Sequence, residues 1–153
     1  MMNSKVNQLF NMLVSTSGDN RSLIPRIIVG LVFLSEGLQK YIIPEVTGTG
    51  RFENIGFDNA EFLAYFVATF EIISGILLLA GFMTRLSAFP PLIIMITAII
   101  TTKIPMLADN GFWAMAHAAR TDFAMTMLLI YLIVYGGGKG SVDRLFFQIK
   151  SRS

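Results

Sequence analysis

Eight charged or titratable side chains lie within or beside long apolar stretches of this sequence, where they could bind a ligand or move a proton. Glu71 is the most deeply placed, because it is the one ionisable residue of the apolar segment 62–82. An ionised side chain at the centre of a bilayer costs about 2.5–3.5 kcal/mol on insertion scales. Glu71 is therefore expected either to carry a proton or to pair with a cation such as Lys40, Arg51 or Lys103.

Small residues on the same helix face indicate that Glu71 points toward protein. Ala64, Ala68, Glu71 and Gly75 are spaced four, three and four residues apart, so a helix presents them on one face. Small residues in membrane helices mark surfaces where a neighbouring helix comes close. Two interpretations stay open: Glu71 lines a functional pocket, or it holds helices together as a structural polar contact.

The remaining candidates are placed at helix faces and helix ends. Glu36 and Lys40 are four residues apart with the acid first, which favours an ion pair on one face. The candidates for ligand binding or proton handling are Glu36, Lys40, Arg51, Glu71, Lys103, His117, Arg120 and Asp122. No catalytic residue and no metal site is assigned.

Each of these candidates also has a structural interpretation. The Glu36–Lys40 pair can be purely structural, and Lys103, Arg120 and Asp122 can simply reach from helix ends to water. A lone histidine such as His117 is usually a capping or hydrogen-bonding residue, and it cannot supply the two ligands of a bis-histidine haem. Thr97 and Thr101 are more typical of helix–helix hydrogen bonds than of ligand contacts.

The composition indicates that the helices carrying these side chains lie in a membrane. The chain has 153 residues, of which 54% are hydrophobic and 14% charged, whereas soluble domains carry about 25% charged residues. A transmembrane helix needs about 20 mainly apolar residues. The candidate spans are 23–43, 61–82, 84–104 and 121–136, and Pro90–Pro91 should bend the third near its first turns.

The sequence therefore predicts an all-α integral membrane protein, a four-helix bundle that forms a single domain over residues 1–153. Short amphipathic helices are expected at both ends, from Val6, Leu9, Phe10 and Leu13 and from Val142, Leu145, Phe146 and Ile149. The chain lacks cysteine, which excludes disulfides, thiolate catalysis and Cys-ligated zinc or iron–sulfur clusters. A net charge of +2 without a basic stripe makes nucleic acid an unexpected partner.

The distribution of Lys and Arg among the short loops predicts the orientation. One side of the bilayer would hold Lys5, Arg21, Arg26, Arg85, Lys139, Arg144, Lys150 and Arg152, and the other side Lys40, Arg51, Lys103 and Arg120. Because loops rich in Lys and Arg stay in the cytoplasm, both termini are expected there. The polar candidates then gather between the bilayer centre and its outer face.

Four motifs in order carry a family resemblance. They read RIIVGLVFLSEGLQK (26–40), GTGRFENIGF (48–57), FEIISGILLLAGFMTRL (70–86) and GGGKGSVD (136–143). Together they resemble the DoxX family of small bacterial membrane proteins over about residues 22–145. The resemblance implies a four-helix membrane bundle in a bacterial inner membrane. Its family-like polar residues here are Arg26, Glu36, Lys40, Arg51, Glu71 and Arg85.

The resemblance also implies a redox setting. The family is related to the membrane subunit of thiosulfate:quinone oxidoreductases, and some members associate with oxidative-stress enzymes or with responses to quinones and catechols. We therefore expect a membrane subunit of a quinone-linked redox or oxidative-stress system that binds a quinone or phenol-like molecule. Glu71 or Glu36 would pass protons, and Lys40 or Arg51 would stabilise an anionic oxygen.

No side chain of this chain carries electrons, so a bound cofactor, with a quinone as the candidate, or a soluble redox partner would have to supply them. Two other functions stay open. One is a scaffold or anchor whose buried charges only fix the helix register. The other is a transporter of small hydrophobic compounds, for which a chain this short would need to form a homo-oligomer.

Overall fold

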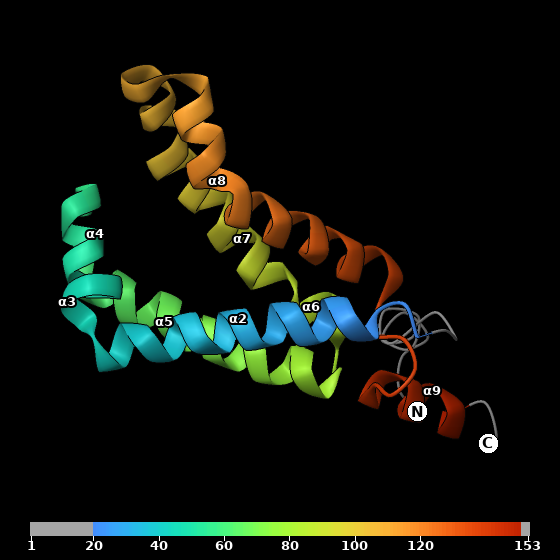
Figure 1. Cartoon of the computed structure of the whole chain (residues 1–153). Coiled ribbons are helices and arrows are strands. Elements are labelled where there is room, and N and C mark those ends of the chain that lie inside the picture. Colours follow the sequence, from blue (N-terminus) through green and yellow to red (C-terminus); the bar gives the residue numbers. More distant parts are fainter. Residues whose placement is uncertain (1–19, 151–153) are drawn as a thin grey trace, which may run out of the picture.

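The computed structural model describes residues 20–150, and within that range every regular element is a helix (Figure 1). The elements are α2 (Leu23–Ile42), α3 (Pro44–Thr47), α4 (Thr49–Ile55), α5 (Ala60–Ala80), α6 (Thr84–Ser87), α7 (Phe89–Ala98), the π-helical turn η1 (Ile99–Lys103), α8 (Ile104–Tyr135) and α9 (Val142–Lys150). The prediction of an all-α fold is confirmed.

Helices α2 and α5 form the most extensive helix pair, because small residues let their backbones approach closely. A Cβ atom added to Gly75 of α5 would lie 2.8 Å from the backbone nitrogen of Leu34 and 2.9 Å from the carbonyl oxygen of Gly30. One added to Gly37 would lie 2.8 Å from the carbonyl oxygen of Ala68. The small-residue face predicted for α5 is therefore the face that packs against α2.

The other half of the molecule is a helical hairpin made of α6, α7, η1 and α8. Gly111 interrupts α8 with φ +79° and ψ 171°, and the chain reverses direction there (Figure 1). That positive φ favours glycine, which has no Cβ to clash. Pro90 and Pro91, expected to bend the third span, occupy the first turn of α7 after α6 has ended at Ser87. Proline is tolerated there because first-turn N–H groups have no helical partner.

The hydropathy of these helices identifies candidate membrane spans. Two stretches are long and apolar enough to cross a membrane, Ala60–Ala80 and Thr84–Tyr135, and the second contains the whole hairpin. A third candidate exists if Leu23–Ile42 and Pro44–Ile55, which meet at 115°, count as one broken span. The predicted span 84–104 and all but the last residue of the predicted span 121–136 lie in the second stretch, on either side of Gly111. The count of four spans stays a prediction.

The apolar core lies where the hairpin packs against the α2–α5 pair. Its buried side chains come from α2, α5, α8 and the residue before α7, and they are Val29, Phe33, Leu78, Ala88, Met125, Leu129 and Leu132. This core joins the two halves toward the α9 end of the molecule, away from the tip of the hairpin (Figure 1).

Two buried charges close the α9 end of the molecule. Arg26 of α2 donates hydrogen bonds from Nη1 to the carbonyl oxygen of Gly137 and from Nη2 to that of Gly140, both at 3.0 Å. Asp143 of α9 accepts hydrogen bonds from the backbone N–H and the hydroxyl of Thr84 at 2.9 and 2.8 Å. Arg26 and the glycine-rich motif are therefore parts of a structural closure.

The helix predicted at the C-terminal end is present as α9. Leu145 and Phe146 are exposed over 59% and 45% of their surface. An amphipathic helix on a membrane surface leaves such side chains to the lipid. The helix predicted from Val6, Leu9, Phe10 and Leu13 lies outside the described residues.

The close contact of α2 and α5 predicts a position-specific sensitivity to added volume. Gly75→Ala should lower the free energy of unfolding by about 1–3 kcal/mol, because its methyl group meets backbone atoms that cannot move independently. Gly30→Ala should cost less, because the nearest atom, 2.7 Å away, belongs to the flexible side chain of Leu79. Thermal unfolding in detergent micelles measures both. Equal stability of the Gly75→Ala variant and the wild type would contradict this packing.

Candidate functional site

A buried ion pair joins α2 to α5. The Nζ atom of Lys40 lies 2.7 Å from Oε2 of Glu71, and the two residues are 7% and 2% exposed. Gly37, one turn before Lys40, contributes to this contact because it lets the backbones of α2 and α5 approach closely there. Lys40 is therefore the cation beside Glu71. Glu36 lies at the edge of the pair, 3.9 Å from the lysine nitrogen and 43% exposed at its side chain.

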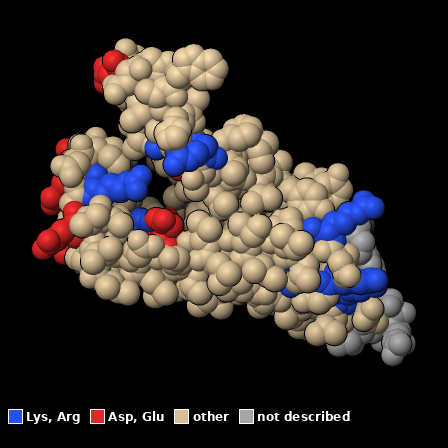
Figure 2. Space-filling model, in the orientation of Figure 1, with Lys and Arg blue, Asp and Glu red and all other residues tan. Residues whose placement is uncertain are grey.

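The ion pair forms part of the wall of a cavity of about 340 Å³. The cavity lies between the α2–α5 pair, α4 and the hairpin, and the molecule is hollowed between α4 and the hairpin in Figure 2. The helices supply an apolar lining that includes Val32, Phe33, Phe52, Ile55, Phe57, Leu63, Phe66, Val67, Ile93, Ile94, Met95, Ala98 and Met125. Five of the predicted residues line it as well: Glu36, Lys40, Arg51, Glu71 and Asp122.

Arg51 differs from the other cations of this region. It lines the cavity from α4, its side chain is exposed, and within residues 20–150 no carboxylate comes within ion-pair distance of it. The α3–α4 segment that carries it turns at Gly48 and Gly50, where an added Cβ would collide with neighbouring backbone. The guanidinium therefore faces the cavity with unused hydrogen-bond donors.

The π-helical turn η1 brings hydroxyl groups to the opposite wall. Thr97, Thr101 and Thr102 line the cavity. The hydroxyl of Thr101 donates to the carbonyl oxygen of Thr97 at 2.8 Å, and that of Thr102 to Ala98 at 2.6 Å. Each oxygen keeps a lone pair that can accept a hydrogen bond. These bonds lie within one helical segment, so the helix–helix hydrogen bonds predicted for Thr97 and Thr101 are not among them.

Lys103 and Asp122 meet across the hairpin. The Nζ atom of Lys103 lies 3.3 Å from Oδ2 of Asp122, and their side chains are 16% and 20% exposed. The contact is an ion pair without hydrogen-bond geometry. It balances the charge of Asp122 at the cavity wall and ties η1 to α8, so these residues do more than reach from helix ends to water.

His117 and Arg120 lie apart from the cavity. Both are exposed, and Nη1 of Arg120 donates to the carbonyl oxygen of His117 at 2.6 Å within the same helix. Among residues 20–150, no three histidine, aspartate or glutamate side chains gather in a way that could hold a metal ion.

Sequence reasoning did not single out Thr102 and Thr121, which also line the cavity. Regular α-helical spacing puts adjacent residues on different faces, so Thr101 and Thr102 would not have been assigned to one wall. The wider π turn changes that spacing, and π turns occur frequently at functional sites. The sequence feature that could have indicated these residues is a pair of threonines followed by a lysine inside an apolar span.

The arrangement suits a particular kind of molecule. The opposite charges cancel within each of two ion pairs, Lys40 with Glu71 and Lys103 with Asp122. Arg51 offers hydrogen-bond donors and the threonines offer acceptors. Aromatic and aliphatic side chains form the remaining wall. A neutral, mainly apolar molecule with one or two oxygen atoms matches these features.

Comparison with known proteins finds one matching family and similar proteins in bacteria. Residues 22–104 match the model of the DoxX family. The chain is 46% identical over 138 residues to an uncharacterized membrane protein of Mycobacterium tuberculosis, covering 86% of this chain and 85% of that protein. It is 30% identical over 132 residues to the Bacillus subtilis protein named "Putative oxidoreductase CatD", covering 84% and 89%. No solved structure matches the chain.

The buried ion pair predicts strongly coupled mutations. Lys40→Met and Glu71→Leu should each lower the free energy of unfolding by about 3–5 kcal/mol, because each leaves one buried charge without a partner. The double variant removes both charges and should recover most of that loss. Denaturant unfolding in micelles measures the cycle.

The matched control is the pair Lys103→Met and Asp122→Leu, whose partly exposed charges should show a smaller coupling. Additive losses in the Lys40 and Glu71 variants would contradict the pairing.

Proposed function

Because this chain belongs to the DoxX family of membrane proteins, we propose that it is the membrane subunit of a quinone-linked redox or oxidative-stress system. The cavity beside Lys40 and Glu71 would hold a quinone or phenol-like molecule. The observation that carries the proposal is the guanidinium of Arg51, which has no ion-pair partner among the described residues and lies at the wall of a mainly apolar cavity. The name of the Bacillus subtilis relative supports a redox role.

Each polar group of the cavity has a role that fits such a ligand. Arg51 would donate to a carbonyl or phenolate oxygen and stabilise negative charge on it. Glu36, which is partly exposed, would exchange protons with water, while Glu71 is already engaged with Lys40. The quinone supplies the electron chemistry when bound. Electrons would reach it from a soluble redox partner, since the sequence has no cysteine that could relay electrons or ligate an iron–sulfur cluster.

The charge distribution supports the proposed orientation in a bacterial inner membrane. In Figure 2 the acidic side chains gather at the α3–α4 end, with some basic ones among them, and the opposite end shows basic side chains. The basic end carries Arg85, Lys139 and Arg144 together with the start of α2 and α9. Positive residues favour the cytoplasmic side, so both described ends of the chain would face the cytoplasm. The cavity would then lie toward the outer face.

A scaffold without a ligand site is the second candidate, and the Lys40–Glu71 pair favours it. Such a pair fixes the register of two helices without binding anything. Ligand binding would require Arg51, whereas a scaffold would not, because Arg51 contributes no ion pair to the fold within the described residues.

Ligand-induced stabilisation tests the proposal. A short-chain ubiquinone or menaquinone analogue should raise the Tm of the purified protein, because binding to the folded state alone stabilises it. Arg51→Gln should abolish the shift while leaving the Tm without ligand unchanged, since the side chain is exposed and unpaired. Lys139→Gln, which removes an exposed cation far from the cavity, should keep the full shift. Absence of any shift in the wild type would favour the scaffold.

A further inference from the structure

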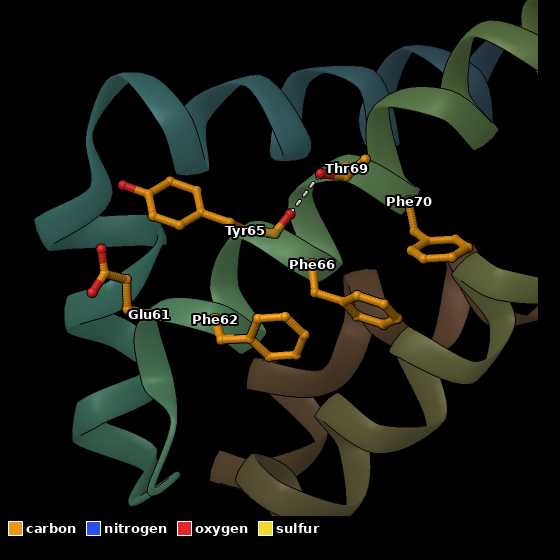
Figure 3. A pocket seen from close by; sticks show the side chains of 6 residues that line it. All are labelled: Glu61, Phe62, Tyr65, Phe66, Thr69 and Phe70. Carbon is orange, nitrogen blue, oxygen red and sulfur yellow. Dashed lines mark hydrogen bonds between the residues drawn. The ribbon is translucent and has the colours of Figure 1, made fainter.

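Phe66 lies at the boundary between the cavity and the outer face of α5. A shallow recess of about 470 Å³ runs along that face, lined by Glu61, Phe62, Tyr65, Phe66, Thr69 and Phe70 (Figure 3). Among the described residues, Phe66 is the one side chain that lines both this recess and the interior cavity. Its ring therefore borders both spaces.

Tyr41 of α2 contacts Tyr65 and Thr69 along one edge of the recess, while the phenylalanines along its other edge are exposed. Phe62, Phe66 and Phe70 are spaced four residues apart along that edge and are 68%, 50% and 39% exposed. Their ring centroids follow one another at 5.8 and 4.8 Å. Because α5 is a candidate membrane span, aromatic side chains this exposed contact the hydrocarbon of the lipid.

Phe66 lies beside the contact between α5 and α7. That contact is far less extensive than the one between α5 and α2. In Figure 3 the ring of Phe66 extends from α5 toward the ribbons of α7 and α8. On the cavity side, its neighbours Leu63 and Val67 are apolar as well. The groups that border Phe66 on the cavity side are therefore mainly apolar.

We infer that Phe66 is a side gate through which a neutral planar aromatic or quinonoid molecule enters the cavity directly from the bilayer. The inference rests on the proposed function, because it presumes a cavity ligand. Such a molecule partitions into hydrocarbon and can move along the adjacent rings of Phe62, Phe66 and Phe70 without exposing apolar surface to water. The single carboxylate of the recess, Glu61, lies on the first turn of α5.

Tryptophan fluorescence can follow both entry and occupancy. The chain has one tryptophan, Trp113, so Trp113→Phe provides a silent background. Leu63→Trp then reports on the cavity alone, Phe70→Trp on the recess alone, and Phe66→Trp on the boundary. The probes are a short-chain ubiquinone analogue, which quenches indole emission, and phospholipids with brominated acyl chains in reconstituted vesicles.

Two results are expected. Brominated lipids should reduce emission from the Phe66→Trp and Phe70→Trp reporters and leave the Leu63→Trp reporter unchanged. The quinone should quench the Leu63→Trp and Phe66→Trp reporters with saturation at low concentration, whereas quenching at Phe70→Trp should rise linearly through collisions in the lipid.

The rate of quinone entry tests the gate itself. In the Leu63→Trp reporter, Phe66→Ala should raise the association and dissociation rates several-fold, while Phe70→Ala should leave both rates unchanged. Saturable quenching with rates unaffected by Phe66→Ala would overturn the gate and leave the proposed cavity ligand standing. Absence of saturable quenching in both the Leu63→Trp and Phe66→Trp reporters would overturn the proposed function and the gate together.

Discussion

The close approach of α2 and α5 is the constraint on which the other features depend. Glycine and alanine on the facing surfaces bring the two backbones together, and that distance lets Lys40 reach Glu71 out of water. The pair is neutral as a unit, so it can remain inside a membrane protein without a net charge to solvate. It also leaves the end of α2 positioned for the turn into α3 and α4, which carries Arg51 to the cavity.

The helix faces that pack together can be predicted from the sequence, because residues three or four positions apart lie on the same face of a helix. The 4-3-4 spacing around Glu71 identifies the face of α5 that packs against a neighbouring helix. The four-residue spacing of Glu36 and Lys40 places both on one face of α2. Which cation would meet Glu71 could not be read, since Lys40, Arg51 and Lys103 were equally available. Choosing among them requires the relative register of different helices, which side-chain packing decides.

The hairpin shows a second limit of reading the sequence. Lys103 and Asp122 lie 19 positions apart, and their contact depends on a reversal at Gly111 and on a turn of π-helix before it. Neither leaves a periodic signal. His117 and Arg120 were grouped with the cavity because they share one end of the molecule, but the face of α8 on which they lie turns them outward. Proximity to an end of a helix was a poor substitute for knowledge of its face.

The two walls of the cavity differ in what holds them. On one side the wall is fastened by the interlocked backbones of α2 and α5. On the other, the hairpin rises well beyond the core with few buried side chains, so much of its surface meets lipid (Figure 1). Tilt of such a segment depends on the thickness of the surrounding hydrocarbon. We therefore expect the width of the cavity to depend on the thickness of the surrounding bilayer as well as on the sequence.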